Sequence, residues 1–322
     1  KPGPEMTPPL SIFPSGVSRM SSADADLFQE IFQREAICYA RSWLYLLRAT
    51  RDDNGGFGYK FVGEGMTAGI GYRHNTFYIV YPIGSRRFQH LMDLCDQIHK
   101  NTLRPVVIKK VDPGLYEQLS ATRRFSANID NFTLFEEEAF PEHILQLERL
   151  FSPMAGTERL LHPFLKKVRR CETKLWSVQG ISWDELECNP GLQKLFGPDP
   201  DKYKSYKQIL REATSSRKND SHYCTCFYYD EKGIIQGLYV SETLEKSSMG
   251  LYCAVSSKSS PGITEWMDYD FFHQLFQQGI HTLHLGGSET QGVDSYVKKL
   301  LPVAPLFPMR PLWTDHNTNL QD

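Results

Sequence analysis

The sequence predicts a protein of mixed α and β structure, α/β (α+β), in two tandem domains, each with a largely antiparallel sheet flanked by helices. The first observation is length, because 322 residues exceed one ordinary hydrophobic core. The second is patterning, because segments with helical spacing of apolar residues alternate with short strand-like segments. The third is order, because the succession of elements near the C-terminus recurs near the start. We therefore predict an extended segment over 1–20 and domains over 21–150 and 151–322.

Composition indicates a folded chain and excludes several classes of protein. Hydrophobic residues make up 40% and charged residues 23% of the sequence, which excludes extensive disorder. No run of 18 apolar residues occurs, so no transmembrane helix is expected. A net charge of -2 argues against a generally basic nucleic-acid-binding protein, although a local basic patch remains open. Seven irregularly spaced cysteines and no recognisable secretory signal predict a cytoplasmic protein.

Up to residue 120 the order reads as helix, strands, helix, strand and helix. Apolar residues at helical spacing, such as Leu27 and Ile31, predict the first helix, and an uninterrupted apolar run after Pro105 predicts a buried strand. The predicted elements are helices at Ala23–Arg48, Ser85–Lys100 and from Pro113, and strands at Phe57–Val62, Ala68–Tyr72, Phe77–Val80 and Pro105–Val111. Three further helices are predicted in the less regular middle of the chain, at Pro141–Phe151, Leu160–Cys171 and Lys202–Ser215.

The last hundred residues have the clearest pattern. A turn at Asp230–Gly233, ending in a glycine suited to positive φ, predicts a hairpin. Thr264 is expected to cap a helix that ends before Gly279. The predicted elements are strands at His222–Tyr229, Ile234–Ser241, Gly250–Val255 and His281–Leu285, and helices at Glu265–Gln278 and Val293–Leu301.

Two motifs in this region resemble the GNAT acyltransferase superfamily. Residues 230–237, DEKGIIQG, resemble its "dG-ii-G" hairpin. Residues 283–299, LHLGGSETQGVDSYVKK, resemble the "L-G-G-S-E-T-x-G-(L/V)-D-x-(F/Y)" segment of proteins similar to the C-terminal domain of phosphatidylglycerol lysyltransferases. Those are tandem GNAT-like proteins related in architecture to the peptidoglycan Fem transferases. The resemblance implies two tandem GNAT-like domains and transfer of an aminoacyl group from aminoacyl-tRNA to an amine or hydroxyl.

The sequence departs from acetyl-CoA-dependent members of the superfamily at the loop expected to hold the pyrophosphate. Those enzymes use a glycine-rich loop whose backbone N–H groups meet the phosphates at a helix N-terminus. Here the corresponding residues 256–264, SSKSSPGIT, contain one glycine and a proline, which has no N–H. The first domain's equivalent, Pro82–Arg87, is equally poor, although Arg86 and Arg87 can meet phosphate as side chains. This argues against acetyl-CoA as the donor.

Candidate catalytic residues cluster where the last predicted strand turns into the last helix. Gly286 and Gly287 would let a substrate approach the backbone closely, and Lys298 would contact substrate. Ser288, Glu289 and Asp294 are the candidates for stabilising the reacting carbonyl and taking a proton. The alternative is structural: Ser288 and Gln291 form a capping box, Glu289 suits the helix dipole, and Asp294 with Lys298 forms a surface ion pair.

Tyrosines on the predicted central strands are further candidates. A tyrosine hydroxyl can act as a general acid or line an acceptor pocket, so we assign Tyr229 a catalytic role and Tyr252 a substrate-binding role. The alternative is that both are packing residues, as most tyrosines on strands are. His222, Cys224 and Cys226 share one face of a strand, but C-x-C is not a usual structural-zinc spacing, and no metal site is expected.

Basic residues concentrate in one stretch of the second domain. Residues 161–220 contain 12 Lys and Arg against 8 Asp and Glu. With nearby tyrosines, these cations suit an RNA backbone and its bases, although a solvated helix face explains them equally well. The candidate nucleic-acid-binding residues are Lys166, Lys167, Arg169, Arg170, Lys204, Lys207 and Arg211.

Three functions are therefore kept open. The leading hypothesis is a cytoplasmic transferase that passes an aminoacyl group from tRNA to a small-molecule, peptide or lipid acceptor, with no cofactor beyond the donor. The second is an acyltransferase that uses an acyl-CoA or carrier-protein thioester. The third is a non-catalytic GNAT-fold module that binds a small molecule or partner.

Overall fold

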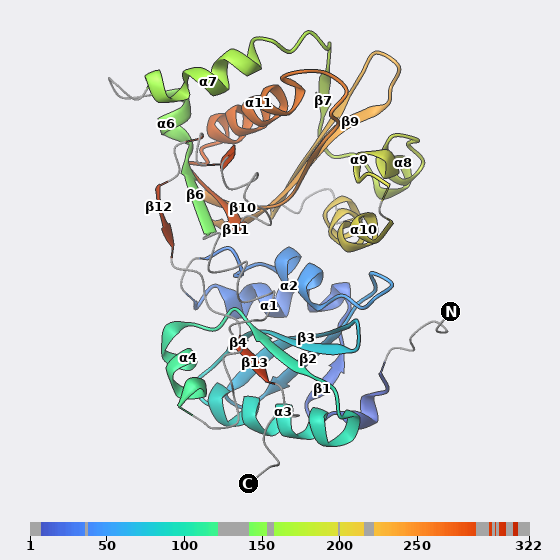
Figure 1. Cartoon of the computed structure of the whole chain (residues 1–322), viewed down its shortest axis with the longest axis vertical. Helices are drawn as coiled ribbons and strands as arrows, with labels where there is room; N and C mark the ends of the chain where they lie inside the picture. Colours follow the sequence, from blue (N-terminus) through green and yellow to red (C-terminus); the bar gives the residue numbers. More distant parts are fainter. Residues whose placement is uncertain are drawn as a thin grey trace. The chain divides into compact units, whose positions relative to one another are not determined.

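A computed structural model describes residues 8–35, 38–121, 142–152, 158–198, 200–215, 222–287, 296–297, 300, 303–306 and 312–314. The chain divides into two compact units. Unit 1 comprises Lys1–Ile31, Tyr45–Ala139 and Phe307–Asp322, and unit 2 comprises Phe32–Leu44 and Phe140–Leu306. Each unit has a mixed sheet with helices packed on it, which confirms the predicted fold class (Figure 1).

The described strands of unit 1 form one sheet in the order β1-β2-β3-β4-β5-β13. Pairing is antiparallel except between β4 and β5, which are parallel. The strands are β1 (Val17–Arg19), β2 (Tyr59–Gly63), β3 (Met66–Arg73), β4 (Thr76–Ile83), β5 (Val106–Lys109) and β13 (Leu312–Thr314). Up to residue 120, the structure describes these helical segments: η1 (Leu10–Ile12), η2 (Ser22–Asp24), α1 (Ala25–Phe32), α2 (Trp43–Thr50), α3 (Arg87–Thr102) and α4 (Pro113–Ser120).

Helix α3 covers one face of the unit 1 sheet because its apolar residues recur at helical spacing. Leu91, Leu94, Cys95 and Ile98 are buried along one stripe of the helix. They pack into a core that includes Ile79 and other side chains of β2–β5. The α3 helix thus connects the parallel strands β4 and β5 by a crossover on this face.

The described strands of unit 2 follow the order β12-β6-β11-β10-β9-β8-β7. Again one central pair, β10 and β11, is parallel, and the remaining pairs are antiparallel. The strands are β6 (Glu142–Gln146), β7 (Trp176–Val178), β8 (Tyr223–Tyr229), β9 (Ile235–Glu245), β10 (Ser248–Ser256), β11 (Thr282–Gly287) and β12 (Val303–Leu306). The helices are α6 (Leu147–Phe151), α7 (Glu158–Val168), α8 (Trp183–Glu187), α9 (Leu192–Leu195), α10 (Pro200–Ser215) and α11 (Ile263–Gln277).

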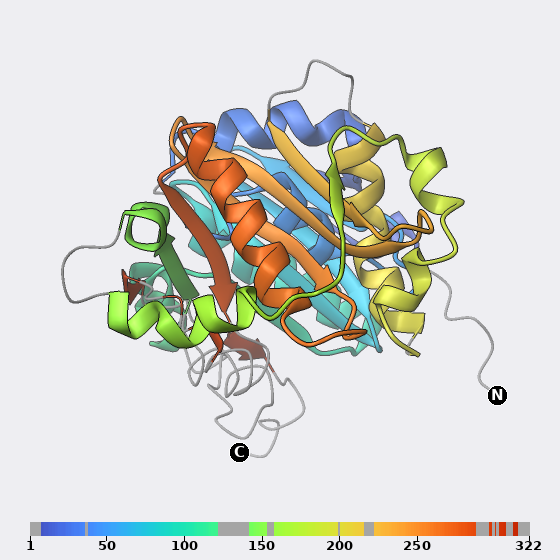
Figure 2. The same cartoon turned by 90° about the horizontal axis from the view of Figure 1, so that it is seen from above.

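Helices α10 and α11 cover opposite faces of the unit 2 sheet (Figure 2). Side chains alternate between the two faces of a strand, so Tyr239 and Glu242 on β9 point to different sides. Tyr239 stacks on Phe271 of α11, with 4.7 Å between ring centroids. Helices α6 and α7 pack beside α11, on the same side as Tyr239. The face of Glu242 is the one that α10 covers.

The two units repeat one topology. Strands β2 to β5, with α3 before the last strand, correspond to β8 to β11, with α11 before the last strand. In each unit the second strand of the parallel pair also pairs with an antiparallel strand on its other side. This strand is β13 beside β5 in unit 1 and β6 beside β11 in unit 2. The repeat of element order that the sequence predicts is therefore present as a repeat of sheet topology.

Two predicted helices are wrong in part. Ala23–Arg48 is not one helix, because α1 ends at Phe32 and α2 begins at Trp43, with non-helical backbone over the described residues 38–42. That stretch is held by hydrogen bonds to strands of unit 2. Residues 142–146 of the predicted helix Pro141–Phe151 form strand β6, because the edge of β11 supplies backbone partners that outweigh local helical spacing. The predicted helix Val293–Leu301 lies mostly outside the described residues.

The units divide the chain differently from the predicted domain ranges. Unit 2 includes Phe32–Leu44 and begins its main range at Phe140, ahead of the predicted boundary at residue 150. Part of the predicted extended segment over 1–20 joins unit 1, since β1 pairs with β2 and Phe13 is buried. Both differences arise from pairings between segments far apart in sequence.

Candidate functional site

The parallel strands β10 and β11 pair over only a short stretch. Their register runs from Ser248 opposite Thr282 to Gly250 opposite His284, although β10 continues to Ser256 and β11 to Gly287. A β-bulge interrupts β10 against β9 between Leu251 and Cys253, directly after the last parallel pair. Ligands of open α/β sheets favour the carboxyl ends of parallel strands, so this end of the pair is the first candidate site.

Tyr39 lies between these two strands just beyond the point where their pairing ends. Its hydroxyl donates a hydrogen bond to the carbonyl of Leu251 on β10 (3.0 Å). The Tyr252 hydroxyl donates to the Tyr39 carbonyl (2.8 Å), and the two rings are 4.7 Å apart. On the β11 side, a Cβ added to Gly286 would lie 2.7 Å from the Tyr39 ring. Gly286 therefore gives room to a side chain of the protein itself, and its φ of +71° also requires glycine.

A buried carboxylate holds the residues that follow Tyr39. Glu242 on β9 accepts hydrogen bonds from the Ser42 hydroxyl (2.6 Å) and from the backbone N–H groups of Trp43 (3.1 Å) and Leu44 (2.8 Å). These N–H groups belong to the first turn of α2, where a carboxylate is favoured. Burial raises the pKa of Glu242 to about 7, and the three hydrogen bonds oppose that shift.

A second buried carboxylate lies on the opposite face of the sheet. Asp268 of α11 accepts hydrogen bonds from the hydroxyls of Tyr239 (2.6 Å) and Tyr296. Burial raises the pKa of Asp268 to about 6, while the two tyrosine hydrogen bonds lower it. Tyr296 belongs to the motif over residues 283–299, so Asp268 fixes one side chain of that motif.

Sequence reasoning missed both Glu242 and Asp268. The available signal was a carboxylate at a position that the periodicity of its element turns toward apolar neighbours, on β9 for Glu242 and on α11 for Asp268. Buried carboxylates need hydrogen-bond donors, which predicts a polar partner even when the partner is unknown.

The N-terminus of α11 is closed. Its first residue follows Gly262, whose φ is +79° and whose added Cβ would lie 2.2 Å from the carbonyl oxygen of Lys167 on α7. Glu265, buried in the first turn, forms an ion pair with Lys167 (2.7 Å). The predicted cap by Thr264 is wrong, because the Thr264 hydroxyl bonds to that of Ser256 (2.7 Å) and Gly262 occupies the cap position. A carboxylate and a carbonyl oxygen thus lie where a phosphate group would need donors.

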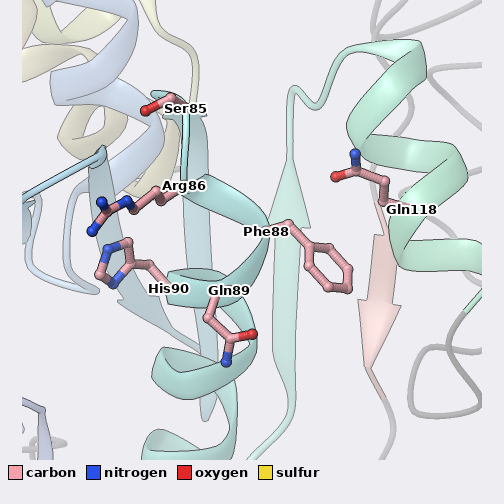
Figure 3. Close-up of a pocket in the computed structure, with 6 residues that line it drawn as sticks. All are labelled: Ser85, Arg86, Phe88, Gln89, His90 and Gln118. Atoms are coloured by element: carbon pink, nitrogen blue, oxygen red, sulfur yellow. The ribbon is translucent and has the colours of Figure 1, made fainter.

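The corresponding helix of unit 1 begins beside an open pocket (Figure 3). The pocket has a volume of about 610 Å³ and is lined by Ser85, Arg86, Phe88, Gln89, His90 and Gln118. Figure 3 shows Arg86 and His90 together on one side of the first turn of α3, with Phe88 and Gln118 on the other. The Arg86 guanidinium lies 3.4 Å from the exposed carboxylate of Glu64. The backbone carbonyl oxygen of Glu64 lies 2.7 Å from His90 Nε2. Arg87, by contrast, forms an ion pair with Asp112.

The remaining predicted catalytic and substrate-binding residues fall into two groups. Ser288, Glu289, Asp294 and Lys298 lie outside the described residues, and Gly287 is the last residue of β11. Tyr252 is buried against Tyr39, whereas Tyr229 is partly exposed and stacks on Trp176. The structure therefore brings Gly286 and Tyr252 together around Tyr39 and places Tyr229 elsewhere, at the end of β8.

The predicted nucleic-acid-binding residues form two separate sets. Lys166, Lys167, Arg169 and Arg170 lie at the C-terminal end of α7, and Lys204, Lys207 and Arg211 lie on α10, which packs on the opposite face of the sheet. Within the described ranges, three of these cations form ion pairs, namely Lys167 with Glu265, Lys204 with Asp201 and Lys207 with Glu187. In the described part of the chain, Lys166, Arg169 and Arg170 are exposed and have no ion-pair partner.

No group of three or more His, Cys, Asp or Glu side chains in the described ranges is arranged to hold a metal ion. Among the helices described here, none has the length and apolar character needed to cross a membrane.

No family model matches the chain, and no curated protein matches its sequence. Solved structures do resemble it. A conserved protein of unknown function from Bacteroides thetaiotaomicron aligns with a TM-score of 0.64 at 11% identity, over 94% of this chain and 98% of that chain. A domain from Agrobacterium fabrum, assigned as the C-terminal domain of a lysylphosphatidylglycerol synthetase, aligns with a TM-score of 0.54 at 13% identity, over 92% and 93%.

A tandem GNAT protein from the clavulanic acid biosynthesis pathway aligns with a TM-score of 0.55 at 9% identity, over 93% of this chain and 97% of that chain. Likenesses at such low identity show a shared fold. The chain therefore has the tandem GNAT fold that its two sequence motifs predict, and the resemblance to the lysyltransferase C-terminal domain is confirmed at the level of fold.

Proposed function

We propose that the protein is an acyltransferase that takes an aminoacyl group from aminoacyl-tRNA and passes it to an amine or hydroxyl acceptor. The class of reaction is supported by the tandem GNAT fold and by the 283–299 motif. The choice of donor depends on one observation, the closed N-terminus of α11. A fold alone does not define a reaction, so the identity of the donor depends on the residues of the site.

A nucleotide thioester such as acyl-CoA carries a diphosphate that needs backbone N–H donors at a helix N-terminus. In unit 2 the Lys167 carbonyl packs against Gly262 at that position, and the buried Glu265 carboxylate lies in the first turn. The Lys167 carbonyl offers an acceptor where a diphosphate needs donors, and the Glu265 carboxylate holds the Lys167 ammonium in an ion pair. An aminoacyl-tRNA ester does not need N–H donors at this helix N-terminus, because its phosphates can be bound by exposed side chains such as Arg169 and Arg170.

In the proposed reaction the acceptor nitrogen or oxygen attacks the ester carbonyl of the aminoacyl group. The new amide or ester bond forms as the bond from the carbonyl carbon to the ribose oxygen breaks. The ribose hydroxyl gains a proton, and the acceptor loses one. The candidates for these roles are Ser288 for stabilising the developing oxyanion and Glu289 or Asp294 for taking the acceptor proton. Tyr229, the general acid expected from the sequence, stacks on Trp176 at the end of β8 and has no part in this step. A small molecule, a peptide or a lipid can each supply such an acceptor.

Binding to tRNA tests the proposal directly. The purified chain would be titrated with aminoacylated and deacylated bulk tRNA across a salt series. We expect the charged pool to bind more tightly, and both affinities to fall as salt rises. Equal affinity for both pools would contradict recognition of the aminoacyl group, and no binding at low salt would contradict a tRNA donor. The amino acids enriched in the bound pool would identify the donor.

The thioester alternative is favoured by a different feature, the pocket beside Arg86 at the start of α3 in unit 1. Unlike α11, this helix begins next to open space, and Arg86 can meet a phosphate group. Calorimetric titration with CoA tests it: binding that Arg86→Ala weakens, and that Lys100→Ala at the other end of α3 leaves unchanged, would support a thioester donor. Failure to bind either tRNA or CoA would favour a non-catalytic binding module.

A further inference from the structure

An exposed aromatic pair lies at the edge of the unit 2 sheet, away from the β10–β11 divergence. Trp176 on the edge strand β7 is 44% exposed. Its ring stacks on that of Tyr229 on β8, with centroids 6.4 Å apart and planes 19° apart. Tyr229 supports one face of the indole, and the exposure of Trp176 leaves the ring accessible to a second planar group.

Exposed cations lie close to Trp176 in the sequence. Residues 166–176 contain five Lys and Arg, against the single acid Glu172. Arg169 and Arg170 are exposed and have no ion-pair partner among the described residues. Lys174, two residues before Trp176, forms one ion pair within the described part of the chain, with the exposed Glu231 at 3.7 Å. Such loose surface pairs contribute little and are easily exchanged.

Hydrogen bonds join the cation-bearing segments at one end of the sheet. The Thr173 hydroxyl bonds to that of Ser260 (2.6 Å), which ties residues 169–175 to the loop that carries Lys258. Ser259 in the same loop donates to Gln236, whose amide bonds to Asp230 directly after Tyr229. Arg170 and Trp176 are six residues apart and hence within about 21 Å. In Figure 1 the chain arches from α7 over this end of unit 2 to β7.

We propose that this surface, formed by Arg169, Arg170, Lys174, Trp176, Tyr229 and Lys258, binds a single-stranded RNA segment. One base stacks on Trp176, and the cations contact the flanking phosphates. Cationic side chains beside an aromatic platform are the general means of binding single strands, because every base has a π face. The identity of the RNA rests on the proposed function. A tRNA donor has an unpaired end, which can bind to this surface as a single strand.

The observations favour RNA over a lipid surface. Insertion into a membrane interface needs apolar side chains that protrude together. Trp176 instead lies against Tyr229, and its strand neighbour Ser177 accepts a hydrogen bond from Gln274 (3.2 Å). Gln179, just after β7, also bonds to Gln274 (2.8 Å). Polar neighbours and a ring stacked in place suit a planar partner with phosphates on either side.

Fluorescence anisotropy of the full chain with a labelled, unstructured RNA of ~12 nucleotides tests the surface. We expect Trp176→Ala to weaken binding about tenfold and Trp176→Phe to retain most of it. Leu160→Ala removes a side chain that is 60% exposed on α7 of the same unit and should have no effect. The double variant Arg169→Ala/Arg170→Ala should reduce the slope of log affinity against log salt by about 1.4, whereas Lys194→Ala should not change it.

Each outcome decides between alternatives. RNA binding that Trp176→Ala and the double arginine variant leave unchanged would overturn this surface, while the tRNA-donor proposal would stand. Equal binding of a duplex of the same length would overturn the single-strand assignment. Vesicles of phosphatidylglycerol and phosphatidylcholine that bind through Trp176, without RNA binding, would replace RNA by a lipid surface. Trp176-dependent RNA binding without preference for charged tRNA would support the surface and contradict the proposed function.

Discussion

The hydroxyl of Tyr39 donates a hydrogen bond to the backbone carbonyl of Leu251, 212 residues further along the chain, at 3.0 Å. The partner strand is β10, at the point where it parts from β11. Tyr39 belongs to the segment Phe32–Leu44, which is part of unit 2. In the sequence this segment precedes every strand of the unit 1 sheet except β1, yet it completes the core of unit 2. This contact fills the end of the parallel pair with a side chain of the protein itself.

Removing the Tyr39 hydroxyl should destabilise the protein measurably. Tyr39→Phe leaves the Leu251 carbonyl buried without this donor, which should lower the free energy of unfolding by about 1–3 kcal/mol. Tyr39→Ala also empties the space between the strands and should cost about 3–5 kcal/mol. Urea denaturation would measure both. Tyr203→Phe is the control, because Tyr203 is a half-buried tyrosine that packs on Phe196. Equal stability of Tyr39→Phe and Tyr203→Phe would contradict the role of the hydrogen bond.

No local pattern in the sequence indicates this contact. Apolar residues at helical spacing on both sides of residues 38–42 predict one continuous helix, because helical propensity reports only on neighbours within about four positions. The partners of this stretch are Leu251, Tyr252 and Glu242, some 200 residues away. A tertiary contact at that separation overrides the local preference and is invisible to pattern analysis of one chain.

Elements with local signals were predicted well. The hairpin around Asp230–Gly233 and helices α10 and α11 are each defined by a turn, an apolar stripe or a terminal glycine within the element itself. Strands β6 and β13 have no such signal, since each is short and gains its strand backbone by pairing with β11 or β5. For the candidate site, the sequence singled out Gly286 and Tyr252 but assigned them to substrate. Tyr39, which contacts both, remained unnoticed.

Glu242 should make stability depend on pH. Burial raises its folded-state pKa from an ordinary value of 4.5 to about 7. Between these values the folded state holds a proton that the unfolded state has lost, so the free energy of unfolding falls as the pH rises from about 4.5 to 7 and then levels off. The full shift corresponds to about 3 kcal/mol.

Comparison with Glu242→Gln isolates the contribution of Glu242, because glutamine does not titrate. The contributions of the other carboxyl groups to the pH dependence are the same in both proteins and cancel in the difference. Chemical denaturation of both proteins at several pH values should give a stability difference, wild type minus variant, that decreases by about 3 kcal/mol across the window. Parallel curves would show that Glu242 titrates normally and would contradict its burial as the dominant influence on its pKa.

Tyr296 should stabilise the ionised form of Asp268. Tyr296→Phe removes one of two hydroxyl donors, so the pKa of Asp268, already raised to about 6, should rise further. Asp268 is protonated at pH 5 and ionised at pH 8. The loss of stability should therefore be larger at pH 8, where it is about 1.5–3 kcal/mol, than at pH 5. Tyr269→Phe, on the same helix as Asp268, is the control, and equal losses for Tyr296→Phe at both pH values would contradict the prediction.

The closed N-terminus of α11 can be tested with two glycines that both have positive φ. Gly262→Ala and Gly180→Ala each place a Cβ in the left-handed region, which costs about 1–2 kcal/mol. At Gly180 nothing lies within 4 Å of the added Cβ, whereas at Gly262 the Lys167 carbonyl lies at 2.2 Å. Thermal or urea unfolding should therefore show a loss for Gly262→Ala that exceeds the loss for Gly180→Ala by 1 kcal/mol or more. Equal losses would mean that α7 does not cover the start of α11. That helix end would then be open to a diphosphate, and the reason for preferring a tRNA ester over a nucleotide thioester would be removed.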